Sequence, residues 1–279
     1  MNFAIAEFDY EALPERVQPF VPALQATERL SLELRLSDTP PQRPDASSVG
    51  GYPYMVSSAE HPRAEDGAPM TFIAQLNLAD LPPLPGYPES GLLQFFGDNT
   101  LLGGARQQQG RVLYHPTVHA GWQPSNDQQL CTRSRRYNGE VQWGLIDPEA
   151  QYSIQGFLQR GPAPDPAASA WEAFEATAAG GDIEDEAIDA FDTIYDEYAD
   201  SYNPRGHRLG GYPTFHQPTH EASGDDPELA LLAQFDSDPW KFSPTYRMRF
   251  RDLGTLRYFI PRTALADKDF SAASFNWDT

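Results

Sequence analysis

The chain carries one series of short motifs twice, once in each half of the sequence. Residues 50–53 (GGYP) recur as residues 210–213, and each copy precedes an apolar segment that contains an Ala-Gln pair. The second glycine of the motif lies 24 positions before Gln75 in the first copy and 23 positions before Gln234 in the second copy. Unrelated loops would seldom reproduce both the motif and its spacing. The sequence therefore predicts one structural unit that is built twice.

A third pair of segments extends this correspondence. Residues 91–96 (GLLQFF) align with residues 254–259 (GTLRYF), so that the glycine, a leucine and the closing aromatic pair stay in register. The period is far longer than that of solenoid repeats, which indicates two half-domains in one pseudo-symmetric body. We predict two related β units, at about residues 50–96 and 210–260. The Gly-Gly-Tyr-Pro motif suits a tight turn at the entry to a strand, and a loop that contacts a ligand is the alternative.

The rest of the chain divides between predicted strands and predicted helices. Prolines limit residues 1–30 to short helical pieces, so we expect a peripheral segment there. We predict a single domain over residues 1–279 with an α+β fold, mostly antiparallel β, and an acidic helical insertion at about residues 167–202. The apolar patterns predict strands at residues 70–78, 91–96, 111–114, 141–145 and 153–158, and the composition predicts helices at residues 167–179 and 183–199.

Composition and charge restrict the class of protein. Apolar residues make up 40% of the 279 residues, so the chain can bury a core without a metal ion or a disulfide. The single cysteine, Cys131, cannot form an intramolecular disulfide, and no basic residue precedes Arg16 as in a secretory signal, so we expect a cytoplasmic protein. No apolar run approaches the roughly 20 residues of a membrane helix. The net charge of −20 repels phosphate backbones, so we expect a basic protein partner and no nucleic-acid or membrane binding.

The repeated motifs resemble those of the YwqG-like family, a bacterial family of unknown function. Its pattern has a Gly-Gly-x-Pro turn, a Trp-Pro, a Gly-x-Pro that leads into a Phe-Leu-Ala-Gln-Ile-Asn strand, and a Gly-Leu-Leu-Gln-Phe-Phe strand. The chain departs from this pattern at His61, where the family usually has tryptophan, and at residues 252–254, where a Gly-Asp-x-Gly turn is more usual. The residues that carry the resemblance are 50–53, 61–62, 67–69, 72–77, 91–96, 210–213, 231–238 and 269–271.

The resemblance runs from about residue 48 to residue 277, which is most of the chain. It implies a mixed fold rich in antiparallel strands. It transfers no catalytic residue, because the family has no established activity. Some relatives are encoded beside secreted bacterial toxins, which implies a role as an immunity protein by association only.

Few residues have a spacing that is typical of metal binding. His115 with His119, and His216 with His220, have the i, i+4 spacing of a zinc site on a helix. A proline lies inside each interval, however, and the residue before a proline is pushed out of the helical region. We therefore expect no metal ion.

Signatures of catalysis are also weak. Three arginines follow Cys131 closely and would favour a thiolate, but no base adjoins it, so a basic loop is the simpler interpretation. Asp236 and Asp238 could bind a cation or act as a carboxylate pair, although aspartate after a strand usually caps a turn. The common hydrolase and nucleotide-binding motifs are missing. We expect no catalytic residue and no cofactor.

The stretch between Arg160 and Arg205 contains twelve acidic residues and no lysine or arginine. Acids at the start of the predicted helix are explained by capping and by the helix dipole. Carboxylates near its end each cost about 0.3 to 1 kcal/mol against the dipole, so folding alone does not explain them. A solvated face that keeps the protein soluble is one interpretation, and a surface for a basic partner is the other. The residues predicted to contact a partner are Asp185, Asp189, Asp192, Asp196, Glu197 and Asp200.

Two functions of different classes follow from these patterns. The first is a non-enzymatic protein-binding module, an immunity protein that neutralises a basic bacterial toxin by stoichiometric binding. The alternative is a small-ligand-binding protein or an enzyme, with a pocket between the two β units. Stoichiometric, salt-sensitive binding is typical of the first, and a deep pocket with perturbed titratable groups is typical of the second. The pocket of the alternative would be lined by Tyr52, Gln75, Tyr212, Gln234 and Asp236.

Overall fold

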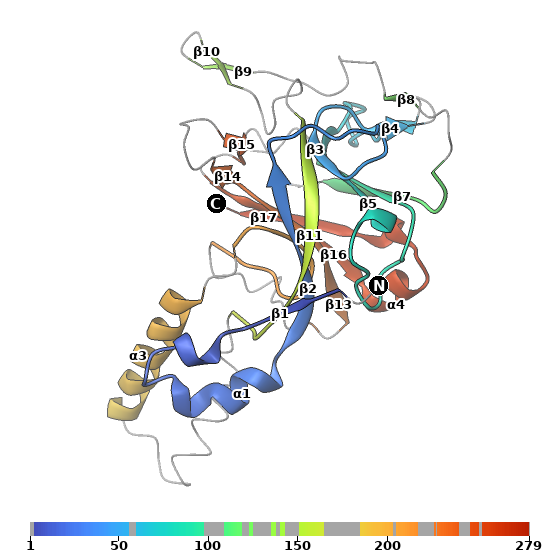
Figure 1. Cartoon of the computed structure of the whole chain (residues 1–279). Helices are drawn as coiled ribbons and strands as arrows, with labels where there is room; N and C mark the ends of the chain where they lie inside the picture. Colours follow the sequence, from blue (N-terminus) through green and yellow to red (C-terminus); the bar gives the residue numbers. More distant parts are fainter. Residues whose placement is uncertain are drawn as a thin grey trace.

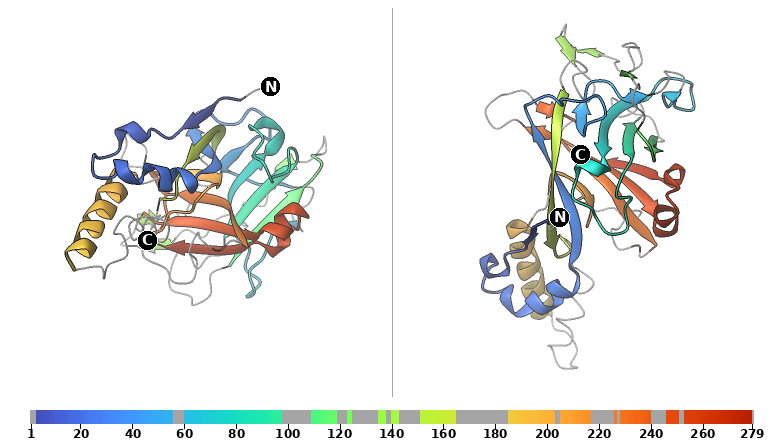
Figure 2. Two further views of the ribbon diagram at one scale, coloured as in Figure 1. Left: turned by 90° about the horizontal axis from the view of Figure 1, so that it is seen from below. Right: turned by 45° about the vertical axis from the view of Figure 1, so that its right-hand side comes forward.

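The structure is a computed structural model in which an eleven-stranded sheet forms the body, and α1 and α3 lie together at one end (Figure 1). The second view in Figure 2 shows the same helices beside the N-terminal segment and clear of most of the sheet. The structure describes residues 3–55, 60–97, 109–118, 123–124, 135–137, 140–142, 151–164, 185–202, 205–216, 226, 228–239, 246–250 and 253–278.

The strands of the large sheet follow the order β17-β16-β13-β12-β2-β11-β3-β5-β6-β7, and β1 joins β11. All pairings in it are antiparallel except that of β1 with β11, which confirms a mostly antiparallel β fold. The bounds are β1 Ile5–Glu7, β2 Arg29–Ser37, β3 Ser48–Gly50, β5 Thr71–Asn77, β6 Leu92–Gly97, β7 Gly110–His115, β11 Gln151–Gly161, β12 His207–Gly210, β13 Leu229–Asp236, β16 Thr255–Pro261 and β17 Ser274–Asp278.

Six short strands form three two-stranded sheets, and the helices are few within the described residues. β4 pairs with β8, β9 with β10, and β14 with β15. Their bounds are β4 Tyr54–Met55, β8 Gln123–Pro124, β9 Arg135–Tyr137, β10 Glu140–Gln142, β14 Asp238–Pro239 and β15 Tyr246–Met248. The α-helices are α1 Val21–Ala26, α3 Asp185–Ser201 and α4 Arg262–Ala266, and 3-10 turns lie at Tyr10–Ala12, Gln18–Phe20, Leu78–Asp80 and Phe270–Ala272.

The central strand β2 was not among the predicted strands. Its leucines alternate with polar residues, and Leu32 and Leu34 are buried against the core. The alternate residues Arg29, Ser31 and Glu33 therefore lie on the opposite face of the sheet. β2 pairs with β11 over nine residues, and this pair connects the two halves of the large sheet. The missed strand thus supplies both the centre of the sheet and a polar face.

Four strands extend from each side of the central pair. We call β3-β5-β6-β7, next to β11, the first flank, and β12-β13-β16-β17, next to β2, the second flank. β5 has an irregular register between Phe72 and Ala74, and β13 has one between Leu231 and Ala233. β7 and β17, the outermost strands of the two flanks, also lie against each other, so the sheet is nearly closed.

Both Gly-Gly motifs require backbone conformations that favour glycine. Gly50 and Gly51 have φ of 71° and 68°, and Gly210 and Gly211 have φ of 65° and 70°. These angles fall in the left-handed region, where a side chain would be strained. The glycines end β3 and β12, and only the first copy of the motif also leads directly into a strand, β4 at Tyr54, as the turn at a strand entry was predicted to do. The turns therefore lead the chain out of the large sheet.

Four hydrophobic clusters lie within the described residues, and two of them, called here the larger and the smaller core, hold the sheet and the helices. The larger one lies within the nearly closed sheet and includes Phe95 and Phe235, whose ring centroids are 5.1 Å apart. The smaller one joins α3 to the N-terminal segment through Leu24, Val17 and Tyr198. As predicted, the described chain before β2 is peripheral and contains only short elements. It is also the surface against which α3 buries its apolar residues.

The predicted helix at residues 183–199 corresponds to α3, which begins and ends two residues later. Ile194 and Tyr198 of this helix pack in the smaller core. Most of the predicted strands differ from the observed strands by one to three residues at their ends. The predicted helix at residues 167–179 and the end of the predicted strand at residues 141–145 lie outside the described residues.

Candidate functional site

The last turn of α3 exposes part of the predicted partner surface. Asp196 and Asp200 are exposed near the C-terminal end of α3, which contains no basic residue. Glu197 is half-buried, and one of its carboxylate oxygens lies 3.3 Å from a guanidinium nitrogen of Arg16. Although no lysine or arginine lies near Glu197 in the sequence, Glu197 does have a basic partner, because the fold brings Arg16 to it from a distant part of the chain. Asp185, Asp189 and Asp192 lie in α3, but their side chains are outside the described part of the structure.

The residues predicted for a ligand pocket are distributed over both flanks. Gln75 is fully buried in β5, and its Oε1 accepts from the backbone N–H of Tyr54 at 3.0 Å. Its amide nitrogen donates to the carbonyl groups of Pro44 and Ala46, at 2.7 and 2.9 Å. Gln94 donates to the carbonyl of Tyr54 at 2.7 Å. Together these bonds fix the chain on both sides of the first Gly-Gly turn.

The second flank repeats this arrangement at matching positions. Gln234 accepts from the N–H of Thr214 at 2.8 Å and donates to the carbonyl of Gly206 at 3.0 Å. Arg257, at the position that aligns with Gln94, donates to the carbonyl of Thr214 at 2.5 Å. Thr214 follows the first glycine of its motif by four residues, as Tyr54 does, and Gly206 precedes it by four, as Ala46 does. We call these two sets of bonds the glutamine clamps.

The other predicted pocket residues are also held in place. Asp236 is buried and accepts from the N–H of Gly206 at 3.0 Å and from the hydroxyl of Thr255 at 2.9 Å. Tyr212 is buried, and its hydroxyl donates to the carbonyl of Thr27 at 2.5 Å. Tyr52 is half-buried. Of the five predicted residues, Tyr212 alone lines either of the two cavities described below.

The residues with weak signatures of chemistry have structural contacts where they are described. A ring nitrogen of His115 lies 3.1 Å from Oε1 of Gln94, and one of His216 lies 3.0 Å from the hydroxyl of Thr255. Burial lowers the pKa of His115. Asp238 pairs with Arg247 at 3.0 Å. Cys131, His119 and His220 lie outside the described residues.

No group of three potential metal ligands comes together among the residues that the structure describes. The same part of the chain has no helix that is long and apolar enough to cross a membrane.

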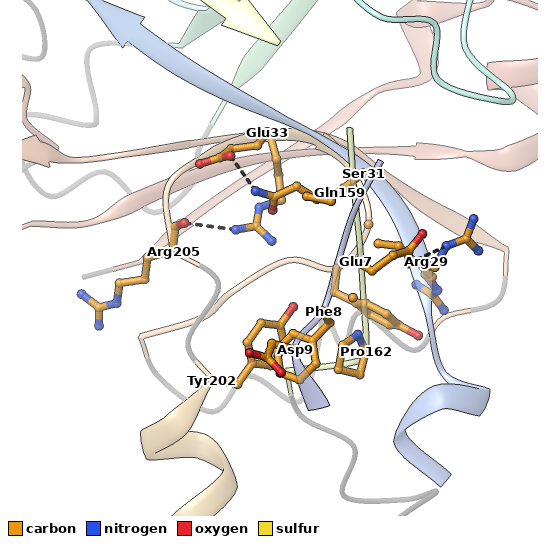
Figure 3. Close-up of a pocket in the computed structure, with 16 residues that line it drawn as sticks. Glu7, Phe8, Asp9, Arg29, Ser31, Glu33, Gln159, Pro162, Tyr202 and Arg205 are labelled. Carbon is orange, nitrogen blue, oxygen red and sulfur yellow. Dashed lines mark hydrogen bonds and ion pairs between the residues drawn. The ribbon is translucent and has the colours of Figure 1, made fainter. Parts of the chain in front are cut away.

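A cavity of about 280 Å³ lies where the N-terminal segment and the end of α3 meet the sheet (Figure 3). The polar face of β2 and β12 forms one side of it, and Arg208 lies directly opposite Glu33 in the strand pairing. Phe8 and Tyr202 lie across from this face, with their ring centroids 4.6 Å apart. The cavity thus draws its lining from segments as distant in sequence as Ala6 and Tyr212.

Four arginines and three acids line this cavity. Glu7 pairs with Arg160 at 3.3 Å, and Glu33 accepts from Gln159 at 2.6 Å and from Arg35, outside the cavity, at 2.7 Å. The third acid, Asp9, accepts from the N–H of Glu11. Each carboxylate therefore already has a donor within the protein.

The arginines are positioned by different contacts. The Arg29 guanidinium carbon lies 3.9 Å from the centroid of the Tyr212 ring. Arg208 donates to the carbonyl of Arg205 at 3.1 Å, and burial lowers the pKa of the Arg208 guanidinium. The side chain of Arg205 points away from Arg29 and Glu7 (Figure 3), with a guanidinium nitrogen 3.4 Å from a ring nitrogen of His216.

A second cavity, of about 380 Å³, adjoins the first. The two share Arg29 and Gly211, so the second Gly-Gly turn lies between them. Leu84, Leu231 and Leu265 contribute to its more apolar lining. The predicted site residues did not include Arg29, Arg208 or Tyr202, although the alternation in residues 29–37 would have placed Arg29 on a polar strand face.

Most of the chain matches one known protein family. Residues 47–279 match the family described as a domain of unknown function (DUF1963). No curated protein matches the chain. Residues 1–46, which contribute β1, α1 and β2, precede the matched region. Since the match covers well over half of the 279 residues, the chain belongs to the DUF1963 family of domains of unknown function.

Proposed function

We propose that this protein is a non-enzymatic protein-binding module that captures a basic partner through the acidic face of α3. The observation that carries the proposal is the C-terminal end of this helix, where Asp196 and Asp200 are exposed and no basic residue lies in α3. Carboxylates at a helix C-terminus oppose the helix dipole, so they cost stability where they stand. A basic partner would offset this cost on binding.

The proposed partner is a bacterial toxin with a basic surface, such as a nuclease, and the protein acts as its stoichiometric inhibitor in the bacterial cytoplasm. The net charge of −20 supports this, because long-range attraction raises the rate at which a basic protein is captured. Fast capture is what an inhibitor needs when its target damages the cell. The similarity of the motifs to the YwqG-like family, with relatives encoded beside toxins, supports the same role.

The same proposal includes an internal duplication that gave rise to the two flanks. The glutamine clamps support it, since Gln75 and Gln234 bond to backbone groups at matching distances from their Gly-Gly turns. The irregular registers in β5 and β13 also fall at matching places, just before the Ala-Gln pair. In this view α3 and its acidic neighbours were inserted between the two units.

The test is binding of the purified partner to the Asp196→Asn/Asp200→Asn double variant. Partners retained from a lysate of the native cell are identified by mass, and the binding of the purified candidate is then measured by calorimetry. We expect one partner per chain, an affinity that falls as salt is raised from about 50 to about 500 mM, and a slower association rate for the variant.

A matched control is the Glu65→Gln/Glu89→Gln double variant, which removes two exposed charges outside α3. It should associate faster than the α3 variant, because its changes lie outside the proposed interface. The proposal fails if the α3 variant binds with unchanged rate and affinity, or if the affinity is the same at low and high salt.

A further inference from the structure

We infer that the cavity between the N-terminal segment, the end of α3 and the polar face of β2 binds a small neutral molecule with several hydroxyl groups, such as a sugar or a cyclic polyol (Figure 3). This inference goes beyond the proposed function, because the cavity and the acidic face of α3 involve different residues. It begins from a difference within the cavity wall. The charged side chains are engaged with the protein, whereas three uncharged side chains keep atoms that can bind a ligand.

The charged side chains of the wall have contacts within the protein. Arg160 pairs with Glu7 at 3.3 Å, and Glu33 accepts from Arg35 at 2.7 Å. The remaining arginines are held by an aromatic ring, a backbone carbonyl and a histidine ring, and the third acid, Asp9, accepts from a backbone N–H. An ionic ligand would lose its hydration here without gaining a free counter-charge. The wall therefore favours a neutral ligand.

The uncharged polar groups of the wall call for a ligand that both donates and accepts. Within the described part of the chain, the hydroxyl groups of Ser31 and Tyr202 have no hydrogen bond to a protein group. Gln159 donates from its amide nitrogen to Glu33 at 2.6 Å, which leaves its Oε1 as an acceptor. A hydroxyl donates and accepts, and an amide oxygen only accepts. Hydroxyl groups on the ligand would satisfy all three side chains.

Tyr202 is positioned for this role by close packing. Its ring centroid lies 4.6 Å from that of Phe8. An added Cβ at Gly161 would stand 2.8 Å from the hydroxyl oxygen of Tyr202, so the glycine leaves room for this hydroxyl. Burial raises the pKa of Tyr202, and the opposing effect of the Arg208 guanidinium is smaller. The hydroxyl therefore keeps its proton and can donate to a ligand.

The two sides of the cavity match the two kinds of surface on a sugar ring. Ser31 and Gln159 lie directly opposite each other in the pairing of β2 with β11, so both belong to the polar face of the sheet. The aromatic rings of Phe8 and Tyr202 lie across from this face. A sugar presents C–H groups on the faces of its ring and hydroxyl groups at the edge. It can thus pack against the aromatic side while its hydroxyl groups bond to the strands.

The cavity limits the size of the ligand. Pockets for drug-sized molecules hold roughly 300 to 1,000 Å³, and this one holds about 280 Å³. We therefore expect a single sugar or polyol ring and not a polymer. Part of the wall, from Ala6 to Glu33, precedes the region that matches the family, so ligand binding would be a property of this chain and not of the whole family.

The experiment is titration of the full chain with glucose, ribose and myo-inositol, each followed separately by saturation-transfer NMR. We expect saturable binding of at least one of the three, with the same Kd at about 50 and about 500 mM salt, because the ligand carries no charge. Tyr202→Phe keeps the ring and removes the hydroxyl, so its Kd should rise about three- to tenfold, as for the loss of one hydrogen bond. Ser31→Ala should have an effect of the same size.

Two further variants make the result specific. Tyr114→Phe is the matched control, because it removes a tyrosine hydroxyl of β7 that bonds to the carbonyl of Ser90, and it should leave the Kd unchanged. Gly161→Ala keeps every polar group but displaces the Tyr202 hydroxyl, so it should weaken binding. The inference is overturned if none of the three compounds binds saturably, or if Tyr202→Phe and Ser31→Ala bind as tightly as Tyr114→Phe.

Discussion

Gln234 is fully buried, and its side-chain amide forms hydrogen bonds with three groups on the two sides of the second Gly-Gly turn. It accepts from the N–H of Thr214, and it donates to the carbonyl of Gly206 and the hydroxyl of Thr214. Since Gln75 does the same for the other Gly-Gly turn, a single residue in each flank fixes a loop that would otherwise have many conformations.

Replacement of Gln234 by alanine should destabilise the protein by about 1 to 3 kcal/mol, because it leaves partly buried backbone groups without their hydrogen bonds. Gln75→Ala should have an effect of the same size. Urea denaturation measures both, with the midpoint lowered and the slope unchanged. Gln25→Ala is the matched control, since Gln25 is exposed on α1, and should change stability by less than about 0.5 kcal/mol. An equally small effect for Gln234→Ala would mean that the clamp contributes little.

At the scale of elements, α3 depends on the N-terminal segment. Tyr198 is buried in the smaller core with Leu24 and Val17, and its hydroxyl donates to the carbonyl of Ala163 at 2.6 Å. The larger core contains none of these residues. The two cores can therefore lose order separately.

Tyr198→Ala should cost on the order of 3 kcal/mol, by analogy with other buried aromatic residues, and should act locally. Amide hydrogen exchange should quicken in α3 and in residues 8–26, while β5, β6, β13 and β16 keep their protection. Tyr198→Phe is the control, because it keeps the ring and loses only the hydrogen bond to Ala163, at a cost of about 1 kcal/mol. Faster exchange throughout the large sheet in Tyr198→Ala would show that the cores unfold together.

At the scale of the whole molecule, the two flanks meet where β7 lies against β17. Gly110 of β7 has no room for a side chain, since an added Cβ would stand 2.6 Å from the Phe275 side chain of β17. Phe275 in turn packs against Tyr258, with ring centroids 5.0 Å apart. The near closure of the sheet thus requires a glycine at this position.

Gly110→Ala should destabilise the protein by about 1 to 3 kcal/mol through overpacking against the Phe275 ring. A double-mutant cycle with Phe275→Ala checks the cause, because most of the cost of Gly110→Ala should disappear once the ring is removed. Thermal or urea unfolding of the four proteins gives the coupling energy. Strictly additive costs would show that β7 and β17 do not meet through this pair.

The sequence by itself determined those strands, helices and turns that depend on residues near one another in the chain. Apolar runs predicted β5 and β6 to within about one residue at each end, and the apolar segment that contains the second Ala-Gln pair lies in β13. Helical composition predicted α3 to within two residues. The Gly-Gly motifs indicated turns with positive φ, because only glycine adopts those angles at no steric cost.

Only the tertiary structure decided which distant residues meet. The alternation in β2 was visible in the sequence, but its place between β11 and β12 follows from strand order, which periodicity does not specify. Arg16 reaches Glu197, and Arg29 reaches Tyr212, although more than half of the chain separates the members of each pair. The cavity could not be predicted for the same reason: its lining comes from β1, β2, β11, β12 and the end of α3, and burial of the two cores brings these segments together.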